Sequence, residues 1–512
     1  MDQIYSKEAF ERFDVLFDGC HEHPIDIDFT LPDYCSDIQK ILKCRFSPEI
    51  SSYSVMQDTL VCDGTCVIHV YYLDTRGDAV HSCEARQQFS LQIKLKHSVT
   101  DPCVSLRAKC DYINCRAVSA RRVDIHGAFS VSAFVTEKRG EALLDTTGGE
   151  DIEFLKEPVS ISTARAQCCS QFTVEDSQEL PAGKPPVETI LRSACTVRMD
   201  ETRVVEGKLL VKGMLNVCVL YLSAADGVTL EPMTFEIPFS RLEDCPGLTE
   251  DAVLDLRLDA GEVTVSPKAE ATGENTRLDI WVRLFLYGAA YCEESIEFVT
   301  DAYSTRCPAA LEHAQGTFVS GVSFRRERFS KKVRFEIAGH EVSSITDVWA
   351  ESGSVNAFTD DSGLHGKGRY TLCVLGVDLS GTPFYAEQAV EFSETLADAG
   401  MGKGVRVSAD LELPRVSAYR IEAADALEVS VELTICFRLS QTQNMTYISA
   451  VETEHDKAYP ENNAALAVYF AQAGERVWDI AKSHRAGVSA LREENDCYED
   501  TIEEARTLLI PV

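Results

Sequence analysis

The sequence is short of positive charge. Its 512 residues include 49 lysines and arginines against 82 aspartates and glutamates, a formal net charge of -33. Such a surface repels phosphate backbones and anionic lipid headgroups, so we expect no nucleic-acid partner and no membrane-surface binding. Long hydrophobic runs are also missing. The longest uncharged apolar stretch, Gly213 to Ala225, is shorter than the roughly 20 residues that a membrane helix needs, so membrane insertion is not expected.

The N-terminus has no apolar stretch behind a basic start, and the first fourteen residues carry six charges. No secretory signal peptide is therefore expected, and the chain is predicted to be cytoplasmic. The 19 cysteines are too few for a disulfide scaffold and form no CxxC pair. The spacings of Cys62 with Cys66 and of Cys110 with Cys115 lack a second ligand pair for zinc. Free, mostly buried thiols in a reducing compartment are predicted.

Motifs for common enzymes are absent as well: the sequence has no GxGxxG, GxxxxGK[ST], HExxH or GxSxG. We predict no enzymatic activity, no catalytic residue and no cofactor. Cys20, His21 and His23 are the densest soft ligands, but neighbouring residues rarely present three ligands to one tetrahedral ion, and Pro24 indicates a loop. Three aspartates between residues 26 and 33 lack the glycine and closing glutamate of a calcium loop. No metal site is predicted.

The chain repeats itself. LPDYCSDIQKIL at 31–42 and LPAGKPPVETIL at 180–191 share Leu, Pro, Ile and Leu at a shift of 149 residues, which also superposes Gly64 on Gly213. A third, more divergent copy is indicated by Cys373 to Leu375, which matches Cys218 to Leu220. The period is the size of a domain and not of a solenoid repeat.

Periodicity indicates the fold of each copy. Leu427 to Ile435 alternates apolar and polar side chains, which is typical of a strand with one wet face, whereas CVIHVYYL and MLNVCVLYL are apolar at nearly every position, as in strands covered on both faces. The predicted fold is mainly β, with tandem antiparallel β-sandwich or barrel-like repeats of about 140–150 residues. We expect an N-terminal segment plus first β-domain at 1–170, a second at 171–310 and a third, divergent one at 311–458.

The C-terminal segment, 464–512, has a different pattern. Val468 to Ala471 is β-like, two short helical patterns follow on either side of Gly487, and Thr507 to Ile510 predicts a closing strand. The segment is therefore predicted to be a small βααβ module.

The module resembles the LysM domain in its turn glycine, its two helices and its closing Leu-Ile-Pro, although DCYEDTIEEAR replaces the usual Pro-Gly turn before the last strand. The resemblance lies in Gly474, Trp478, Ile480, Ala481, Val488, Leu491 and Asn495. The upstream repeats resemble SPOCS domains. SPOCS repeats followed by one LysM domain are similar to the SipL-like family of spore-coat morphogenetic proteins of spore-forming Firmicutes, clostridia among them.

This resemblance implies a scaffold in the mother cell, at the forespore surface, that links the spore coat to that surface. It implies docking of the LysM-like module on the stage IV sporulation protein A ATPase, with other coat proteins as further partners. The alternative is a protein of the cell wall or spore cortex whose LysM-like module binds N-acetylglucosamine chains of peptidoglycan.

The expected binding groove lies between the turn after the first strand of the module and the end of its second helix. Its acidic rim would repel the carboxylates of peptidoglycan stems and suits a basic protein surface, with two arginines as anchors. Trp478 is predicted to be core and not a ligand contact. The predicted partner-binding residues are Gly474, Glu475, Arg476, Arg492, Glu493, Glu494, Asn495 and Asp496.

Overall fold

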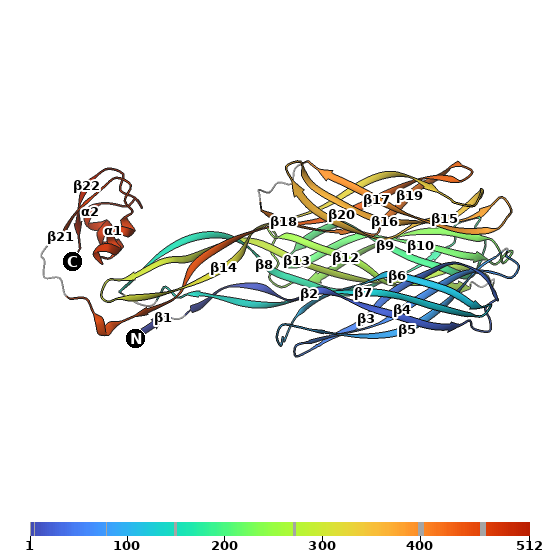
Figure 1. Cartoon of the computed structure of the whole chain (residues 1–512), viewed down its shortest axis with the longest axis horizontal. Helices are drawn as coiled ribbons and strands as arrows, with labels where there is room; N and C mark the ends of the chain where they lie inside the picture. The colour runs from blue at the N-terminus through green and yellow to red at the C-terminus, as the bar shows by residue number, and fades with distance from the viewer. Residues whose placement is uncertain are drawn as a thin grey trace.

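The computed structural model describes residues 2–4, 6–77, 79–147, 151–269, 273–397, 404–460 and 467–511. The molecule is elongated: three β-sandwiches lie together at one end, a stalk of long strands leads away from them, and a small helical module lies at the tip (Figure 1). All strand pairs are antiparallel. The prediction of a mainly β chain with tandem repeats and a terminal βααβ module is confirmed, and the described sheets pack as sandwiches without closing into barrels.

The first sandwich packs the sheet β2-β7-β6 against the sheet β3-β4-β5. Its strands are β2 (Ser6–Thr30), β3 (Ile38–Met56), β4 (Thr59–Asp74), β5 (Val80–Lys94), β6 (Cys103–Ser119) and β7 (Arg122–Leu144). The second sandwich repeats this arrangement with β8-β13-β12 against β9-β10-β11. Its strands are β8 (Ile152–Glu179), β9 (Val187–Val205), β10 (Lys208–Ser223), β11 (Leu230–Asp244), β12 (Val253–Ala269) and β13 (Asn275–Ser304).

The third sandwich packs β14 and β20 against the sheet β15-β16-β17, and the strand that follows β17 is split into β18 and β19. Pro414 lies in the interruption between them, where a proline has no N–H to offer the ladder. The elements are β14 (Ala309–Glu336), β15 (Val342–Asp360), β16 (Gly363–Asp378), β17 (Pro383–Leu396), β18 (Val405–Leu411), β19 (Arg415–Ala423) and β20 (Ala426–Thr453). A 3-10 turn, His455–Lys457, follows β20.

One cross-strand contact recurs in all three sandwiches. A glycine of the central strand lies opposite a phenylalanine whose ring covers it: Gly64 opposite Phe89, Gly213 opposite Phe239, and Gly368 opposite Phe392. A Cβ at Gly213 would come within 2.7 Å of the Phe239 ring and 2.1 Å of the Arg198 carbonyl oxygen. Only glycine fits there, so the divergent third copy preserves the same packing.

The cores follow the predicted periodicity. In β20 the side chains of Leu427, Val429, Val431, Leu433 and Ile435 are fully buried, while the residues between them reach the surface. Central strand β4 is buried on both faces, because its second face packs on the neighbouring sandwich. That second contact is apolar and contains Tyr71, Leu73, Val80, Leu191 and Leu222.

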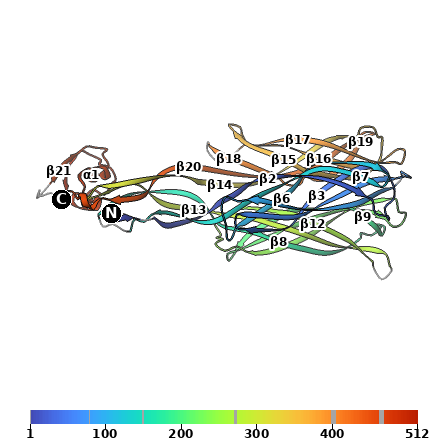
Figure 2. The same cartoon turned by 60° about the horizontal axis from the view of Figure 1, so that its bottom comes forward.

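The stalk consists of the strand segments that continue beyond the sandwiches (Figure 2). Each repeat contributes one two-stranded ribbon: β2 with β7, β8 with β13, and β14 with β20. The short N-terminal strand β1 (Asp2–Ile4) pairs with the other edge of β20, next to the partner positions of β14. The ribbons share a small core to which every repeat contributes, made of Phe10, Leu143, Ile161, Phe298, Phe318 and Tyr447.

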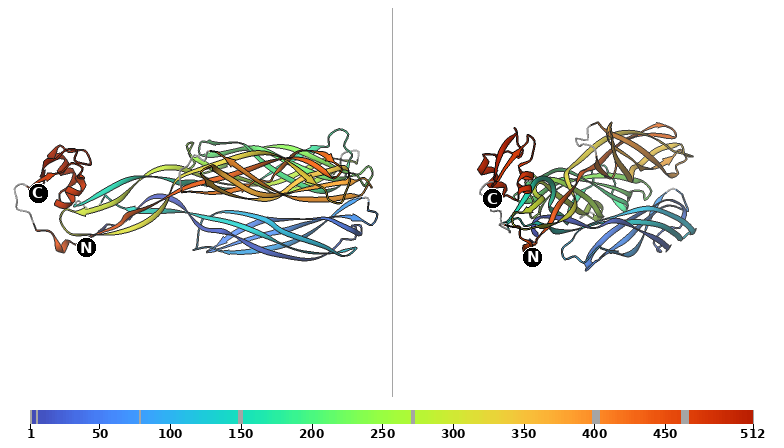
Figure 3. Two further views of the ribbon diagram at one scale, coloured as in Figure 1. Left: turned by 45° about the horizontal axis from the view of Figure 1, so that its top comes forward. Right: turned by 60° about the vertical axis from the view of Figure 1, so that its left-hand side comes forward.

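The chain passes from one repeat to the next at the stalk tip. The first change lies between Leu144 and Ile152, and the second between Ser304 and Ala309. The three sandwiches therefore all point away from the tip, as the turned view in Figure 3 shows. The unit boundaries expected from the sequence remain a prediction.

The N-terminal segment is a strand, so the loop expected around Pro24 is a wrong prediction. Pro24 pairs with Ala128 in the edge strand of the sheet β2-β7-β6, a position in which proline is tolerated. Cys20 accepts a hydrogen bond from Ser132 at 3.5 Å, and His23 packs edge-on against Phe129. Within the described residues, no group of three or more His, Cys, Asp or Glu side chains is placed to hold a metal ion.

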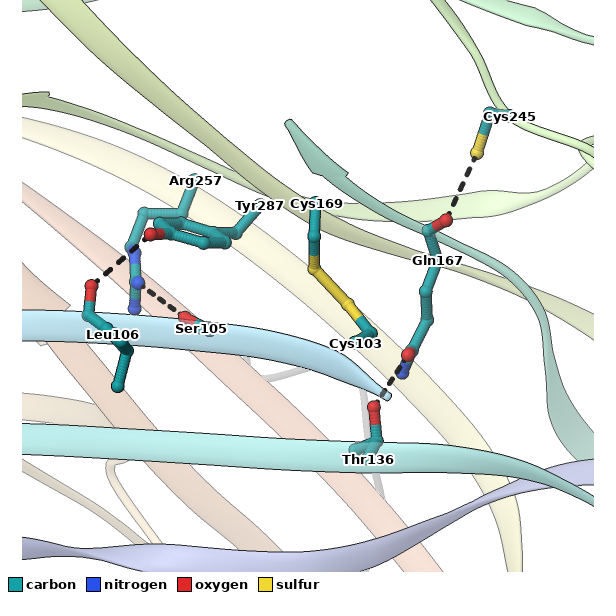
Figure 4. Close-up of a disulfide and its surroundings, with 9 residues drawn as sticks. All are labelled: Cys103, Ser105, Leu106, Thr136, Gln167, Cys169, Cys245, Arg257 and Tyr287. Carbon is teal, nitrogen blue, oxygen red and sulfur yellow. Dashed lines mark hydrogen bonds between the residues drawn. A yellow bond between two sulfur atoms is a disulfide. The ribbon is translucent and has the colours of Figure 1, made fainter. Parts of the chain in front are cut away.

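A disulfide joins the first two repeats. Cys103 of β6 is bonded to Cys169 of β8 (Figure 4), so the prediction of free thiols is wrong for these two residues. It holds for the other seventeen, of which only Cys20 is exposed. The disulfide lies among polar contacts between the same repeats: Thr136 donates to Gln167 Oε1 at 2.6 Å, and Arg257 donates to Ser105 at 2.8 Å. Sequence spacing alone does not reveal a bond between two separate repeats.

Candidate functional site

The C-terminal module has the predicted order of elements. β21 (Ala467–Ala471) pairs with β22 (Arg506–Ile510), and α1 (Val477–His484) and α2 (Val488–Asn495) lie between them in sequence. Residues 464–466 and 512 of the expected module lie outside the described residues. The helices pack on the sheet through an apolar core that includes Val477, Trp478, Ile480, Ala481, Leu491 and Leu508. The expectation that Trp478 is a core residue is confirmed, since it is 7% exposed.

Backbone hydrogen bonds join the turn before α1 to the connection between α2 and β22. Gly474, whose φ of 92° suits glycine, donates its N–H to the Ile502 carbonyl at 2.7 Å. Val477 donates to the Asp500 carbonyl at 3.0 Å, and Ile502 donates to the Glu475 carbonyl at 2.9 Å. The turn before α1 and the connection from α2 to β22 therefore form one continuous edge of the module.

The predicted site residues fall into three groups along this edge. Gly474, Arg476, Glu493, Glu494 and Asp496 are exposed. Their side chains are therefore accessible to a binding partner without any rearrangement of the module.

Glu475 and Arg492 are half-buried and held by neighbours. Glu475 accepts hydrogen bonds from the Tyr469 hydroxyl at 3.0 Å and from the Gln472 backbone at 2.8 Å. Arg492 donates to Asp500 at 2.6 Å. These two side chains are oriented by the module itself, which lowers the entropy that a bound state would cost.

Asn495 is buried and serves the fold of the module. Its side-chain amide donates to the carbonyls of Leu491 at 2.8 Å and Leu509 at 2.7 Å, and its oxygen accepts from the Leu509 N–H at 2.6 Å. It therefore clamps the end of α2 to β22. Any contact of Asn495 with a partner would have to run through its backbone.

The module is fixed to the stalk by contacts that the sequence does not reveal. Asp301 of β13 accepts a hydrogen bond from Trp478 Nε1 at 2.9 Å and two from Lys482 Nζ at 2.7 and 2.6 Å. Tyr303 donates to the Ala486 carbonyl at 2.6 Å, and its ring packs edge-on against Trp478. These partners are far apart in the sequence, so no local signal could have paired them.

The contact has an electrostatic consequence. Burial alone would raise the pKa of Asp301, but the hydrogen bonds from Lys482 and Trp478 outweigh it and hold that pKa below its ordinary value. Burial raises the pKa of Tyr303. Both groups keep the charge state that the contact needs at neutral pH.

Two cations of the module are bound at the stalk. Lys482 is paired with Asp301, and the Arg485 guanidinium lies 3.6 Å from the centre of the Tyr459 ring, so both cations face the stalk. The helix α2 is about 12 Å long, as expected for eight residues. The exposed acids at and after the end of α2 are Glu493, Glu494, Asp496, Glu499, Asp500, Glu503 and Glu504.

In the part of the chain that the structure describes, no helix combines the length and the apolar character needed to cross a membrane. Two segments match the family model described as SipL, SPOCS domain, over residues 37–118 and 186–268. No curated protein and no solved structure matches the chain. The matched segments cover β3 to β6 of the first sandwich and β9 to β12 of the second, which are the equivalent parts of the two repeats. The first two repeats of the chain therefore contain SPOCS domains of the SipL type.

Proposed function

We propose that this protein is a non-enzymatic sporulation scaffold that links the spore coat to the forespore surface from the mother-cell side. In this proposal the LysM-like module docks on the stage IV sporulation protein A ATPase, and the SPOCS repeats face other coat proteins. The observation that carries it is the acidic surface at the end of α2 and in the residues after it, where Glu493, Glu494 and Asp496 are exposed, while Lys482 and Arg485 are bound at the stalk.

Several features support a protein partner over a glycan. The exposed carboxylates Glu493, Glu494 and Asp496 favour encounter with a basic protein surface, since complementary charge raises association rates. The same carboxylates would repel the carboxylates of the peptide stems in peptidoglycan. The half-buried Arg492 is already oriented by Asp500 and would act as an anchor at the centre of the contact.

The test is a charge reversal in the full-length chain, with Glu493, Glu494 and Asp496 all changed to Lys. Reversing three exposed interface charges at about 0.5–1 kcal/mol each should weaken binding to the purified ATPase roughly tenfold or more. A matched control reverses Glu175, Glu236 and Glu391, which are exposed acids on the sandwiches. The control changes net charge equally, so it should leave affinity within about twofold.

The alternative function is peptidoglycan binding, which the βααβ topology of the module favours. Both variants and the unmodified chain would be tested on purified peptidoglycan alongside the ATPase. The scaffold function is supported if the ATPase retains the unmodified chain and the control variant but not the variant with Lys at positions 493, 494 and 496. Retention on peptidoglycan without retention by the ATPase would overturn it and favour the alternative.

A further inference from the structure

A basic stretch lies at the C-terminal end of β14. The last twelve residues of this strand contain six cations and two glutamates, although acids outnumber cations by 82 to 49 in the whole chain. The six cations are Arg325, Arg326, Arg328, Lys331, Lys332 and Arg334. The end of this strand therefore has a charge opposite to that of the protein as a whole.

The equivalent strand ends of the first two repeats are acidic. The last twelve residues of β2 and of β8 each contain three acids and no lysine or arginine. All three strand ends occupy the same place, since each is an edge strand that pairs with the beginning of β7, β13 or β20. Charged side chains protect edge strands from aggregation, and acids serve that purpose in β2 and β8. Edge protection alone therefore does not explain why the charge is reversed in β14.

The cations of β14 continue into a basic surface across the sheet. Arg328, Lys332 and Arg334 are exposed and lie on one face of β14, because side chains two residues apart point the same way. On the other side of β20, the strand β19 contributes Arg415 and Arg420 to the same face, opposite glutamates of β20. The third-repeat basic surface is defined by these five side chains: Arg328, Lys332, Arg334, Arg415 and Arg420.

Two glutamates of β20 lie in the centre of this surface. Glu428 forms ion pairs with Lys332 and Arg420, both at 3.1 Å. Glu432 accepts two hydrogen bonds from Arg415, at 3.1 and 2.7 Å. The side chains of Lys332 and Arg420 nevertheless remain 70% and 68% exposed. The two central carboxylates therefore orient some of the cations without covering them.

Further carboxylates lie only at the end of the surface. Glu422 and Glu336 are 3.6 and 3.8 Å from the Arg334 guanidinium, which is too far for a good hydrogen bond. Arg334 is itself 60% exposed. On the face of the three strands between Arg328 and Arg334, five cations therefore lie around two carboxylates.

The size of the surface limits what it can bind. Six residues of strand between Arg328 and Arg334 span about 20 Å, and the distance from β14 across β20 to β19 is about 10 Å. Both lengths exceed the screening length of about 8 Å at physiological salt. A ligand confined to this surface is therefore attracted by the five cations, while the acids elsewhere on the chain are screened. A nucleic-acid duplex or a bilayer would extend past it and meet those acids.

We propose that the third-repeat basic surface binds an acidic segment of a protein partner through its carboxylates. Four of the five cations are arginines, whose planar guanidinium groups present paired N–H donors to a carboxylate. This inference deepens the proposed function: it rests on the repeats having a protein partner and states the chemistry of that partner.

The test measures binding of a fluorescent decaglutamate peptide to the full-length chain by anisotropy. The triple variant Arg328→Gln, Lys332→Gln, Arg334→Gln should bind the peptide roughly tenfold more weakly or worse. Raising the salt from about 50 to about 500 mM should weaken binding to the unmodified chain in the same way.

A matched control changes Lys94, Arg139 and Lys268 to Gln, whose side chains are 71%, 63% and 59% exposed in the other two repeats. It alters net charge equally and should leave affinity for the peptide within about twofold. Circular dichroism would check that both triple variants fold.

The substitution Glu428→Gln should have the opposite effect. It removes the carboxylate that Lys332 and Arg420 share, so both cations become free to bind the peptide, and affinity should rise about threefold or more. If these charges acted only within the fold, the substitution would not strengthen binding.

The proposal is overturned if the unmodified chain does not bind decaglutamate at about 50 mM salt, or binds decaglutamine equally well. Tighter binding of a DNA duplex or of anionic vesicles than of the peptide would also overturn it. Binding to the sporulation ATPase is measured on the same samples. A chain that binds the peptide but not the ATPase would contradict the proposed docking of the module and leave this surface supported.

Discussion

Replacement of Asp301 by Ala should free the module from the stalk without unfolding either part. Trp478 Nε1 would lose its acceptor in a buried position, which costs about 1–3 kcal/mol. The Lys482 side chain is 41% exposed, so the lost ion pair adds at most about 1 kcal/mol. A total near 2–3 kcal/mol shifts the equilibrium between docked and undocked module by roughly 30- to 150-fold.

Hydrogen exchange followed by mass spectrometry would measure this release. The Glu153 carboxylate covers the start of α2 at Gly487 only while the module is docked, so the peptide around Val488 should exchange faster in the variant. The amide of Leu491, which is bonded within the module to the Gly487 carbonyl, should be unchanged.

The control is Glu297→Ala, which removes an exposed carboxylate from the same strand β13. It should leave both exchange rates as they are. If Asp301→Ala had no effect at Val488, or if Leu491 exchanged equally fast, the docking contact would not have the strength argued from its hydrogen bonds.

Acid should release the module in the same way. The pKa of Asp301 is lower in the docked state than its ordinary 3.8, so the contact contributes its full stability above that value and loses it as the pH falls through the lowered pKa. The Val488 peptide would report it.

Three further outcomes test other parts of the molecule. Burial, with repulsion from Glu262, raises the pKa of Glu49 to about 7, so stability is lost as the pH rises through 7. The substitution Glu49→Gln should therefore stabilise the protein at pH 8 by up to about 3 kcal/mol, and it should have no such effect at pH 4. Denaturant titrations at the two pH values would measure the difference. Asn495→Ala should destabilise the module by about 2–3 kcal/mol, seen as faster exchange of the Leu509 amide, and an unchanged rate would contradict its role as a clamp. Phe298→Ala should cost about 3–5 kcal/mol in the stalk core, against less than about 0.5 for the exposed control Met56→Ala, both read from unfolding midpoints.

The sequence pattern predicted the individual strands and helices, because their formation depends on residues close together in the chain. The alternation from Leu427 to Ile435 indicated a strand with one buried face, and the apolar run from Cys66 to Leu73 indicated a strand buried on both. The spacing of Val477, Ile480 and Ala481 indicated the first helix of the module. In each case one element contains the whole signal.

The sequence pattern could not predict which distant residues contact each other. The stalk ribbons use the same alternation as the sandwiches, so nothing in β8 or β13 marks where one part ends and the other begins. The bond of Cys103 with Cys169 and the contact of Trp478 with Asp301 join residues that only the assembled repeats bring together. Such contacts depend on how whole repeats are arranged, which spacing does not specify.

The continuity of the stalk strands sets how the protein would carry load. β20 runs unbroken from its sandwich to the tip and is hydrogen-bonded along its length to β14, with β1 added at its end. Those bonds lie perpendicular to the strands. A force applied along the molecule, between a partner bound at the tip and a partner bound at the sandwiches, would therefore load many of these hydrogen bonds in shear at the same time. The bonds would not break one after another, so the stalk would act as a stiff tether.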